Sequence, residues 1–125
     1  MASYPTPEIV TFKADAAIAK GKACKVGTDS KHVAAGSANT SLSLGLAQNA
    51  ATAAEDLVEV AVGGGAIGLA GESISGGNLL VSHTDGSLVK ANSSGDIIVA
   101  MALEDASSGD LFAVLVVHGQ AAAAV

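Results

Sequence analysis

The hydrophobic residues of this chain lie in short runs, wholly or partly alternating with polar residues, and turn-forming residues separate the runs. A period of two residues is typical of strands, whereas helices show a period near 3.6. Strands are expected at residues 8–13, 42–46, 57–62, 79–81, 87–90, 97–101 and 111–117. Tight turns are expected at Gly27–Ser30, Asp85-Gly86 and Ser94–Asp96. Short strands joined by short turns predict an all-β domain, either a small β-barrel or a β-sandwich-like fold.

The core must be built from aliphatic side chains. Hydrophobic residues make up 50% of the 125 positions, but aromatic residues make up only 2%, and Phe12 and Phe112 are the only phenylalanines. A large aromatic side chain buries about 150–250 Å², so an alanine-rich core gains less free energy per residue at ~25 cal/mol per Å². We therefore expect burial between subunits to supply part of the stability. The alternative is an ordinary monomer with a well-packed β core.

Two alanine-rich segments could be mistaken for helices. Residues 47–56 contain no apolar stripe that could dock on a core, so a short turn or a loop is expected there. Residues 119–125 are too few to hold a helix alone, and a flexible tail is expected.

The chain also repeats itself. Ile18–Gly21 matches Ile74–Gly77, Thr28-Asp29 matches Thr84-Asp85, and Asp56–Val60 matches Asp110–Val114, with shifts between 54 and 56 residues. The pattern predicts two pseudo-repeats, roughly residues 16–62 and 72–117, packed as one pseudo-symmetric domain because half a chain could hardly bury its own core. The alternative is a chance alignment of low-complexity β sequence.

A glycine-rich stretch, residues 61–72, connects the two halves. A phosphate-binding loop would need a lysine and a helix start after the glycines, and neither follows. The stretch is interpreted as a bulged crossover or a hairpin.

Side chains that could carry chemistry are few and scattered. His32 and His83 are expected to be solvated turn residues, and His118 is expected to follow the last strand; none has metal-ligand spacing. Cys24 is expected to be a small structural residue, the alternative being a nucleophile whose pKa is lowered by neighbouring lysines. The acidic residues cluster at turns, where carboxylates bond backbone amides. The sequence therefore predicts no catalytic residue, no metal site and no cofactor.

Charge and composition exclude several classes of protein. The net charge is −6 and no arginine is present, so the basic face and stacking aromatics of a nucleic-acid binder are missing. A single cysteine allows no disulfide within the chain, and no run of 18 apolar residues could span a membrane. The start of the sequence lacks the pattern of a signal peptide. Residues 1–31 carry a net charge of +2 and residues 32–125 a net charge of −8, which favours two surfaces of opposite character, one of them for an acidic protein partner.

The first 13 residues are predicted to form an extended N-terminal arm, followed by a single β domain at 14–118 and a tail at 119–125. Prolines lower the entropy that the arm would lose on ordering, and its apolar residues could add a strand to a neighbour's sheet. A frayed terminus is the alternative. The candidate residues for a capsid or subunit interface are Tyr4, Pro5, Pro7, Ile9, Val10, Phe12 and Lys13.

A series of glycine and turn motifs covers most of residues 8–118. They are Ile18–Ala23, Leu44–Ala47, Val58–Gly64, Ile74–Val81, Asp85–Ala91 and Asp110–Val116. Together they resemble the capsid cement, or head decoration, proteins of tailed bacteriophages. The resemblance implies a non-enzymatic β-rich domain of β-tulip type, commonly a homotrimer. Such a protein is made in the host cytoplasm, binds the major capsid protein on the outer surface of the virion and stabilises the shell.

Two other functions stay open at this stage. One is a tail- or fibre-associated β module, which the sequence does not separate from a head protein. The other is a small oligomeric β enzyme or carrier domain. A carrier needs a lysine at a hairpin tip, whereas Lys90 lies in a strand pattern, and a nucleotide-hydrolysing trimer would need an arginine.

Overall fold

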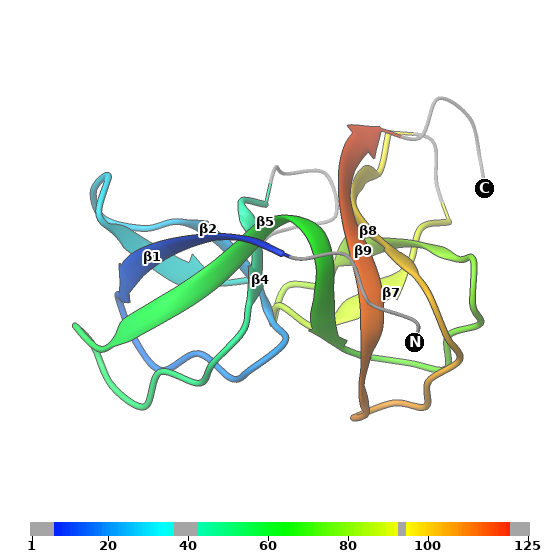
Figure 1. The fold of residues 1–125 in the computed structure, drawn as a ribbon, viewed down its shortest axis with the longest axis horizontal. Coiled ribbons are helices and arrows are strands. Elements are labelled where there is room, and N and C mark those ends of the chain that lie inside the picture. The colour runs from blue at the N-terminus through cyan, green and yellow to red at the C-terminus, as the bar shows by residue number, and fades with distance from the viewer. Residues whose placement is uncertain (1–6, 37–42, 93–94, 121–125) are drawn as a thin grey trace.

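The computed structural model describes residues 7–36, 43–92 and 95–120, and within these residues the regular structure is entirely strand (Figure 1). The strands are β1 (Glu8–Ala14), β2 (Ala23–Val26), β3 (His32–Ala35), β4 (Gly45–Ala47), β5 (Leu57–Leu69), β6 (Leu79–Ser82), β7 (Leu88–Lys90), β8 (Ile97–Ala102) and β9 (Leu111–Gln120). The prediction of an all-β chain is confirmed. The expected turns at Gly27–Ser30 and Asp85-Gly86 join antiparallel strand pairs, β2–β3 and β6–β7.

The strands form two lobes that share β5 (Figure 1). In the first lobe, residues 8–62, the pairings β1–β3, β3–β2, β2–β4, β4–β5 and β5–β1 close into a ring. In the second lobe, residues 64–120, the later part of β5 pairs with β9, followed by β8, β6 and β7. A parallel bridge between Ala70 and Leu88 then closes this ring as well.

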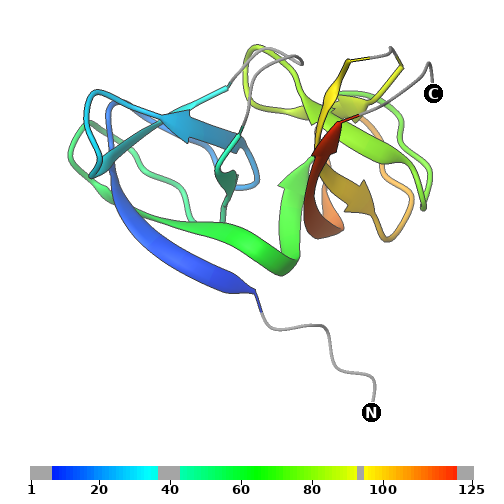
Figure 2. The same cartoon turned by 90° about the horizontal axis from the view of Figure 1, so that it is seen from above.

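The glycine-rich stretch is part of a strand, so its interpretation as a crossover or hairpin is wrong. β5 continues through it for 13 residues and changes partner, from β1 up to Gly63 to β9 from Gly64 onward. Gly64 has a φ of 75°, which glycine adopts without strain, and the strand bends sharply between the lobes (Figure 2). The glycines therefore redirect the strand without ending it.

The two lobes make the same backbone hydrogen bonds at matching positions. Ile18 and Ala51 bond each other at 2.8 and 2.9 Å, as do Ile74 and Ala106. Three further pairs of bonds match: Gly21 N to Ala47 O and Gly77 N to Ala102 O, Ala14 N to Asp56 O and Ala70 N to Asp110 O, and Gln48 N to Glu59 O and Leu103 N to Ala113 O.

These matches make β1 the counterpart of the later part of β5. Each is the first strand of its lobe and pairs antiparallel with the last strand, as Lys13 with Leu57 and Leu69 with Leu111. The units therefore begin near residues 8 and 64, earlier than the repeats at 16–62 and 72–117. From Glu8 onward the predicted arm is paired within its own chain, and residues 1–6 lie outside the described residues.

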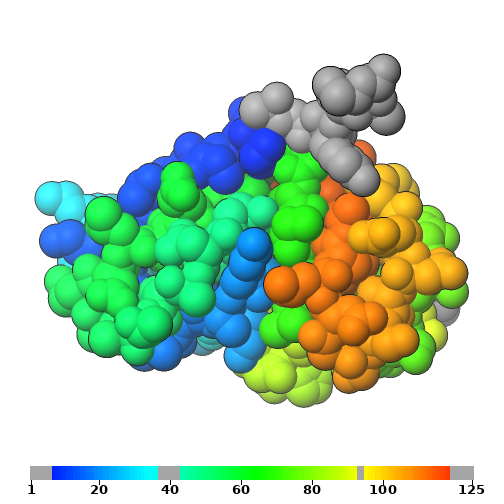
Figure 3. Space-filling model, turned by 60° about the horizontal axis from the view of Figure 1, so that its bottom comes forward, coloured from blue at the N-terminus to red at the C-terminus, as the bar shows by residue number. Residues whose placement is uncertain are grey.

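Each lobe has its own interior, and one side of the first lobe closes the interior of the second. The interior of the first lobe contains Ala14, Ile18, Cys24, Val33, Ala47, Ala51, Val58 and Val60. Three residues on the outer face of the first lobe, Ala23, Leu46 and Ala61, are 0% exposed and pack in the core cluster of the second lobe. Figure 3 shows the two lobes in direct contact. We call the packing of Gly21, Ala23, Leu46, Gln48 and Ala61 against the second lobe the lobe contact.

The alanine-rich segments are not helical where they are described. Residues 48–56 form bends, turns and the Ala51 bridge. β9 extends to Gln120, so it includes His118, which was expected to follow the last strand, and the first two residues of the predicted tail. Residues 121–125, Ser94 of the expected third turn, and residue 42 of the expected strand 42–46 lie outside the described residues.

Candidate functional site

A cleft of about 300 Å³ lies along β1. It is lined by Val10, Thr11, Phe12, Lys13, Ser30, Lys31 and Leu57. Val10 is 44% exposed and Leu57 is 63% exposed, whereas Phe12 packs partly against the interior of the first lobe. Three apolar side chains, of Val10, Phe12 and Leu57, together with two exposed lysines make this β1 cleft a surface suited to a protein partner with an acidic border.

Three of the candidate interface residues, Val10, Phe12 and Lys13, come together in the β1 cleft, and Ile9 next to them is exposed. Pro7 lies elsewhere, in a second cleft of about 370 Å³ beside Gln48, Ile67 and Leu103. Tyr4 and Pro5 lie outside the described residues.

Ser30, Lys31 and Leu57 were not among the candidates. Ser30 and Lys31 come from the β2–β3 turn, and Leu57 is the first residue of β5. The sequence does not indicate that the fold brings them to β1. The one hint is a leucine at the exposed start of a strand.

Cys24 cannot act as a thiolate nucleophile in the folded protein. Its side chain is buried in the first lobe, and burial raises the pKa of the thiol to about 12, an effect that a backbone hydrogen bond from Ala47 only partly offsets. The lysine neighbours do not lower it, because the fold directs the thiol away from them into the core. The interpretation as a small structural residue agrees with this position.

His32 joins two loops of the first lobe. Its Nδ1 lies 2.7 Å from Asp29 Oδ1 and its Nε2 lies 2.5 Å from Glu55 Oε2. Both ring nitrogens can donate only in the imidazolium form. The hydrogen bond to Asp29, and after it the hydrogen bond to Glu55, raise the pKa of His32. The bond between His32 and Asp29 also lowers the pKa of Asp29. His32 thus sits in a turn as expected, but its ring is engaged by carboxylates rather than by solvent alone.

We call the contacts of His32 with Asp29 and Glu55 the His32 clamp. The backbone conformation of Glu55 supports a specific role for this clamp. Glu55 has a φ of 74°, a left-handed conformation that costs a non-glycine residue about 1–2 kcal/mol. Its counterpart in the second lobe is Gly109, with a φ of 89° and the equivalent hydrogen bond to Ala70 O. A glutamate in place of glycine here carries the strain and supplies a carboxylate to His32.

We expect the stability of the protein to decrease as pH rises through the raised pKa of His32. A folded-state pKa above the unfolded value of about 6.5 means that the contribution is fully present below that value and is lost at higher pH. At the acid end it is lost again as pH falls through the pKa of Asp29, which the bond to His32 lowers. Urea unfolding of the wild type and of His32→Gln should therefore differ most in mildly acid buffer, and a difference independent of pH would contradict the clamp.

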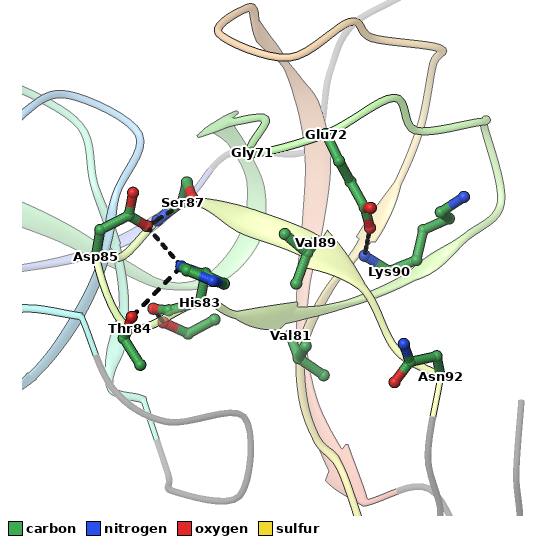
Figure 4. A pocket seen from close by; sticks show the side chains of 11 residues that line it. Gly71, Glu72, Val81, His83, Thr84, Asp85, Ser87, Val89, Lys90 and Asn92 are labelled. Carbon is green, nitrogen blue, oxygen red and sulfur yellow. Dashed lines mark hydrogen bonds and ion pairs between the residues drawn. The ribbon is translucent and has the colours of Figure 1, made fainter.

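A polar cleft of about 560 Å³ lies on the second lobe, beside β6 and β7 (Figure 4). Its side chains bond one another and the local backbone: Lys90 N donates to Glu72 Oε2 at 2.8 Å, and the hydroxyl and N–H of Ser87 donate to Asp85 Oδ1 at 2.6 and 2.9 Å. Bonding to Ser87 lowers the pKa of Asp85. His83 is exposed, with Nδ1 3.4 Å from Asp85. His83 Nδ1 also lies 3.5 Å from the Thr84 hydroxyl, and these bonds together hold the β6–β7 turn (Figure 4).

Neither a metal site nor a membrane span is found in the described parts of the chain. No three His, Cys, Asp or Glu residues among them are grouped to hold an ion, and no helix there is long and apolar enough to cross a membrane. The surface features with a shape for binding are the clefts.

A solved structure shares this fold. In its fold the chain is similar to the head fiber gp8.5 N base of bacteriophage phi29, whose crystal structure superposes with a TM-score of 0.71 at 15% sequence identity. The superposition covers 92% of this chain and 98% of that one. No match was found among curated protein sequences.

The phage cement protein family matches residues 5–118, nearly the whole sequence. The chain therefore belongs to the phage cement protein family, and its role is structural and associated with the capsid, as the sequence motifs indicated.

Proposed function

We propose that this protein binds the major capsid protein on the outer surface of a tailed-phage head, associates there as a homotrimer, and stabilises the shell without catalysing a reaction. Membership of the cement protein family is the observation that carries the proposal. An acidic chain, with a net charge of −6, is repelled by packaged DNA, which favours the outside of the shell. The stabilisation is mechanical, because apolar surface buried across subunit boundaries lowers the free energy of the closed shell.

The N-terminal residues are the proposed contact with the capsid. Tyr4 and Pro5 precede the sheet, Pro7 lies beside an apolar cleft, and the side chain of Ile9 is exposed. Val10, Phe12 and Lys13 line the β1 cleft and are assigned to a contact between subunits. Lysines near this end of the chain suit an acidic protein surface, so capsid binding should weaken as salt rises.

Particles with and without the protein provide the test. Heating should release DNA at a lower temperature from particles that lack the protein, and adding the purified protein back should restore the wild-type release temperature. Equal release from the two kinds of particle would refute the stabilising role.

Deleting residues 1–6 is expected to weaken attachment to the capsid by about tenfold or more, which corresponds to a loss of at least ~1.4 kcal/mol of binding free energy. The deletion stops before β1, so the pairing of β1 with β5 and the thermal midpoint should be unchanged. Occupancy on particles measures the effect. Deletion of residues 121–125 is the matched control at the other terminus, and wild-type occupancy of the first variant would contradict the assignment.

A second candidate is the base of a fibre on the virion. The likeness in fold to the N base of the phi29 head fiber favours it. Electron microscopy of the parent particle separates the two, since a cement protein covers the head at regular capsomer positions whereas a fibre base carries a projecting density.

A further inference from the structure

Because the two lobes are duplicates, the β1 cleft can be compared with the equivalent positions of the second lobe. The counterparts of its lining residues in the second lobe are Ala66, Ile67, Gly68, Leu69, Gly86, Ser87 and Leu111. The first lobe covers part of these positions in the lobe contact: Gly68, Gly86 and Ser87 are buried, whereas Leu111 is still 50% exposed. Ile67 donates its N–H to Gln48 Oε1, and Gln48 Nε2 donates to Ile67 O, both at 3.0 Å.

Gly21 and Ala23 complete this cover. Leu69 N donates to Gly21 O at 3.0 Å, Ala23 N donates to Gly86 O at 2.7 Å, and a Cβ on Gly21 would lie 3.0 Å from the Leu111 side chain. The site is therefore partly filled on the second lobe, at Leu69 and Gly86, whereas none of the lobe-contact residues lines the equivalent site on the first lobe, the β1 cleft of about 300 Å³.

Among the described residues, the part of the second lobe that corresponds to the covering segment is partly exposed, and its Leu103 shares a cleft with Pro7 and Gln48. The counterparts of Gly21, Ala23, Leu46, Gln48 and Ala61 are Gly77, Leu79, Met101, Leu103 and Leu115, which we call the free face. Leu79 is 39% exposed and Leu103 is 42% exposed, Met101 and Leu115 are half-buried, and nothing lies within 4 Å of where a Cβ on Gly77 would be. Leu79, Met101 and Leu115 are cross-strand neighbours in one row, as Ala23, Leu46 and Ala61 are in the first lobe.

The β1 cleft and the free face carry charged residues where the two surfaces of the lobe contact do not. The β1 cleft carries Lys13 and Lys31 where the filled site has Leu69 and Ser87. The free face is bordered by Glu104 and Asp105, both exposed, where the covering segment has Asn49 and Ala50. Lys13 N–H already donates to Lys31 O, and Leu103 has no side-chain amide, so the hydrogen bonds that Gly21 and Gln48 make to the second lobe have no equivalent at these positions.

We infer that the β1 cleft of one copy binds the free face of a second copy, so that the contact between lobes within a chain is repeated between chains. The contact is head-to-tail, because cleft and face lie on different lobes, and it closes into a ring or continues as a chain. Both surfaces combine exposed apolar side chains with charges, basic on the cleft and acidic beside the free face, which is the composition of a specific interface. Self-association through this contact does not require the capsid, so it can be tested on purified protein apart from the proposed attachment.

Two single variants and their mixture test the contact. Leu57→Glu places a charge in the β1 cleft, and Leu103→Glu places one on the free face; both side chains are exposed, so the fold should tolerate them. Sedimentation velocity should show the wild type as an assembly and each variant alone as a monomer. An equal mixture should form dimers, because each variant retains the surface that the other lacks. Val26→Asp is the control, since Val26 is 63% exposed and lines neither surface.

Each outcome either supports or overturns the head-to-tail contact. Loss of assembly in both variants, with dimers in the mixture, supports the head-to-tail contact, as does weaker assembly of the wild type at high salt. A monomeric wild type, or a variant that assembles like the wild type, overturns it. A mixture that stays monomeric also overturns it, since two surfaces that bind each other must complement. Thermal unfolding of each variant near the wild-type midpoint shows that the fold is intact.

Discussion

Replacing Leu46 with alanine is expected to lower the free energy of unfolding by about 3 kcal/mol. Leu46 belongs to β4 of the first lobe, is 0% exposed, and packs in the core of the second lobe with Leu80, Leu88 and Phe112. The substitution removes buried apolar volume where no water can enter and leaves a cavity between lobes. Urea unfolding measures the loss.

Met101→Ala is the matched control for Leu46→Ala. Met101 is the counterpart of Leu46 in the second lobe, but it is half-buried on the free face. Measured at dilutions at which the chain is monomeric, this substitution should cost about 1 kcal/mol or less. Equal losses for the two variants would mean that Leu46 does not contribute more than its counterpart, and the description of the lobe contact would be wrong.

Gly21→Ala is expected to destabilise the protein by about 2–5 kcal/mol, the sum of left-handed strain and overpacking. Gly21 has a φ of 88°, and a Cβ there would lie 2.7 Å from Leu69 N and 2.9 Å from Gly68 C. Both atoms are backbone and cannot rotate away, so the lobes must separate. Gly77→Ala has the same strain at a φ of 92° and meets no atom within 4 Å, so it should cost only about 1–2 kcal/mol in the monomer. The difference between the two variants in urea unfolding isolates the steric part, and no difference would contradict it.

Much of the fold follows from the sequence because the strands are local patterns. Alternation placed β1, β6, β7 and β8 within a residue or two, and the turn at Asp85-Gly86 followed from its residue types. β5 was underestimated because glycine is rare in strands, and seven residues beyond the predicted end at residue 62 still pair. In this strand the glycines are needed for the bend at Gly64 and for the close packing of Gly68 against Leu88, which local propensity does not report.

The candidate site was only partly predictable. Val10, Phe12 and Lys13 were identified from the apolar N-terminal pattern, but the sequence placed them on a free arm, because pairing of β1 with β5 joins residues 44 to 55 positions apart. Leu57 enters the cleft through the same long-range pairing, whereas Lys31 enters it beside the pairing of β1 with β3, where Lys13 N donates to Lys31 O. The clamp at His32 was missed because its partners, Asp29 and Glu55, lie on different loops, and one of them is 23 positions away.

The continuous course of β5 has a mechanical consequence. Its backbone supplies an edge to both rings, so a pull on either lobe is carried into the other through covalent bonds and not only through side-chain packing. Neither lobe can then unfold without disturbing the other lobe, and we expect the molecule to unfold in a single step under an applied force. For a capsid-associated protein, this behaviour means that unfolding begins at a sharp threshold of force and not by gradual loosening.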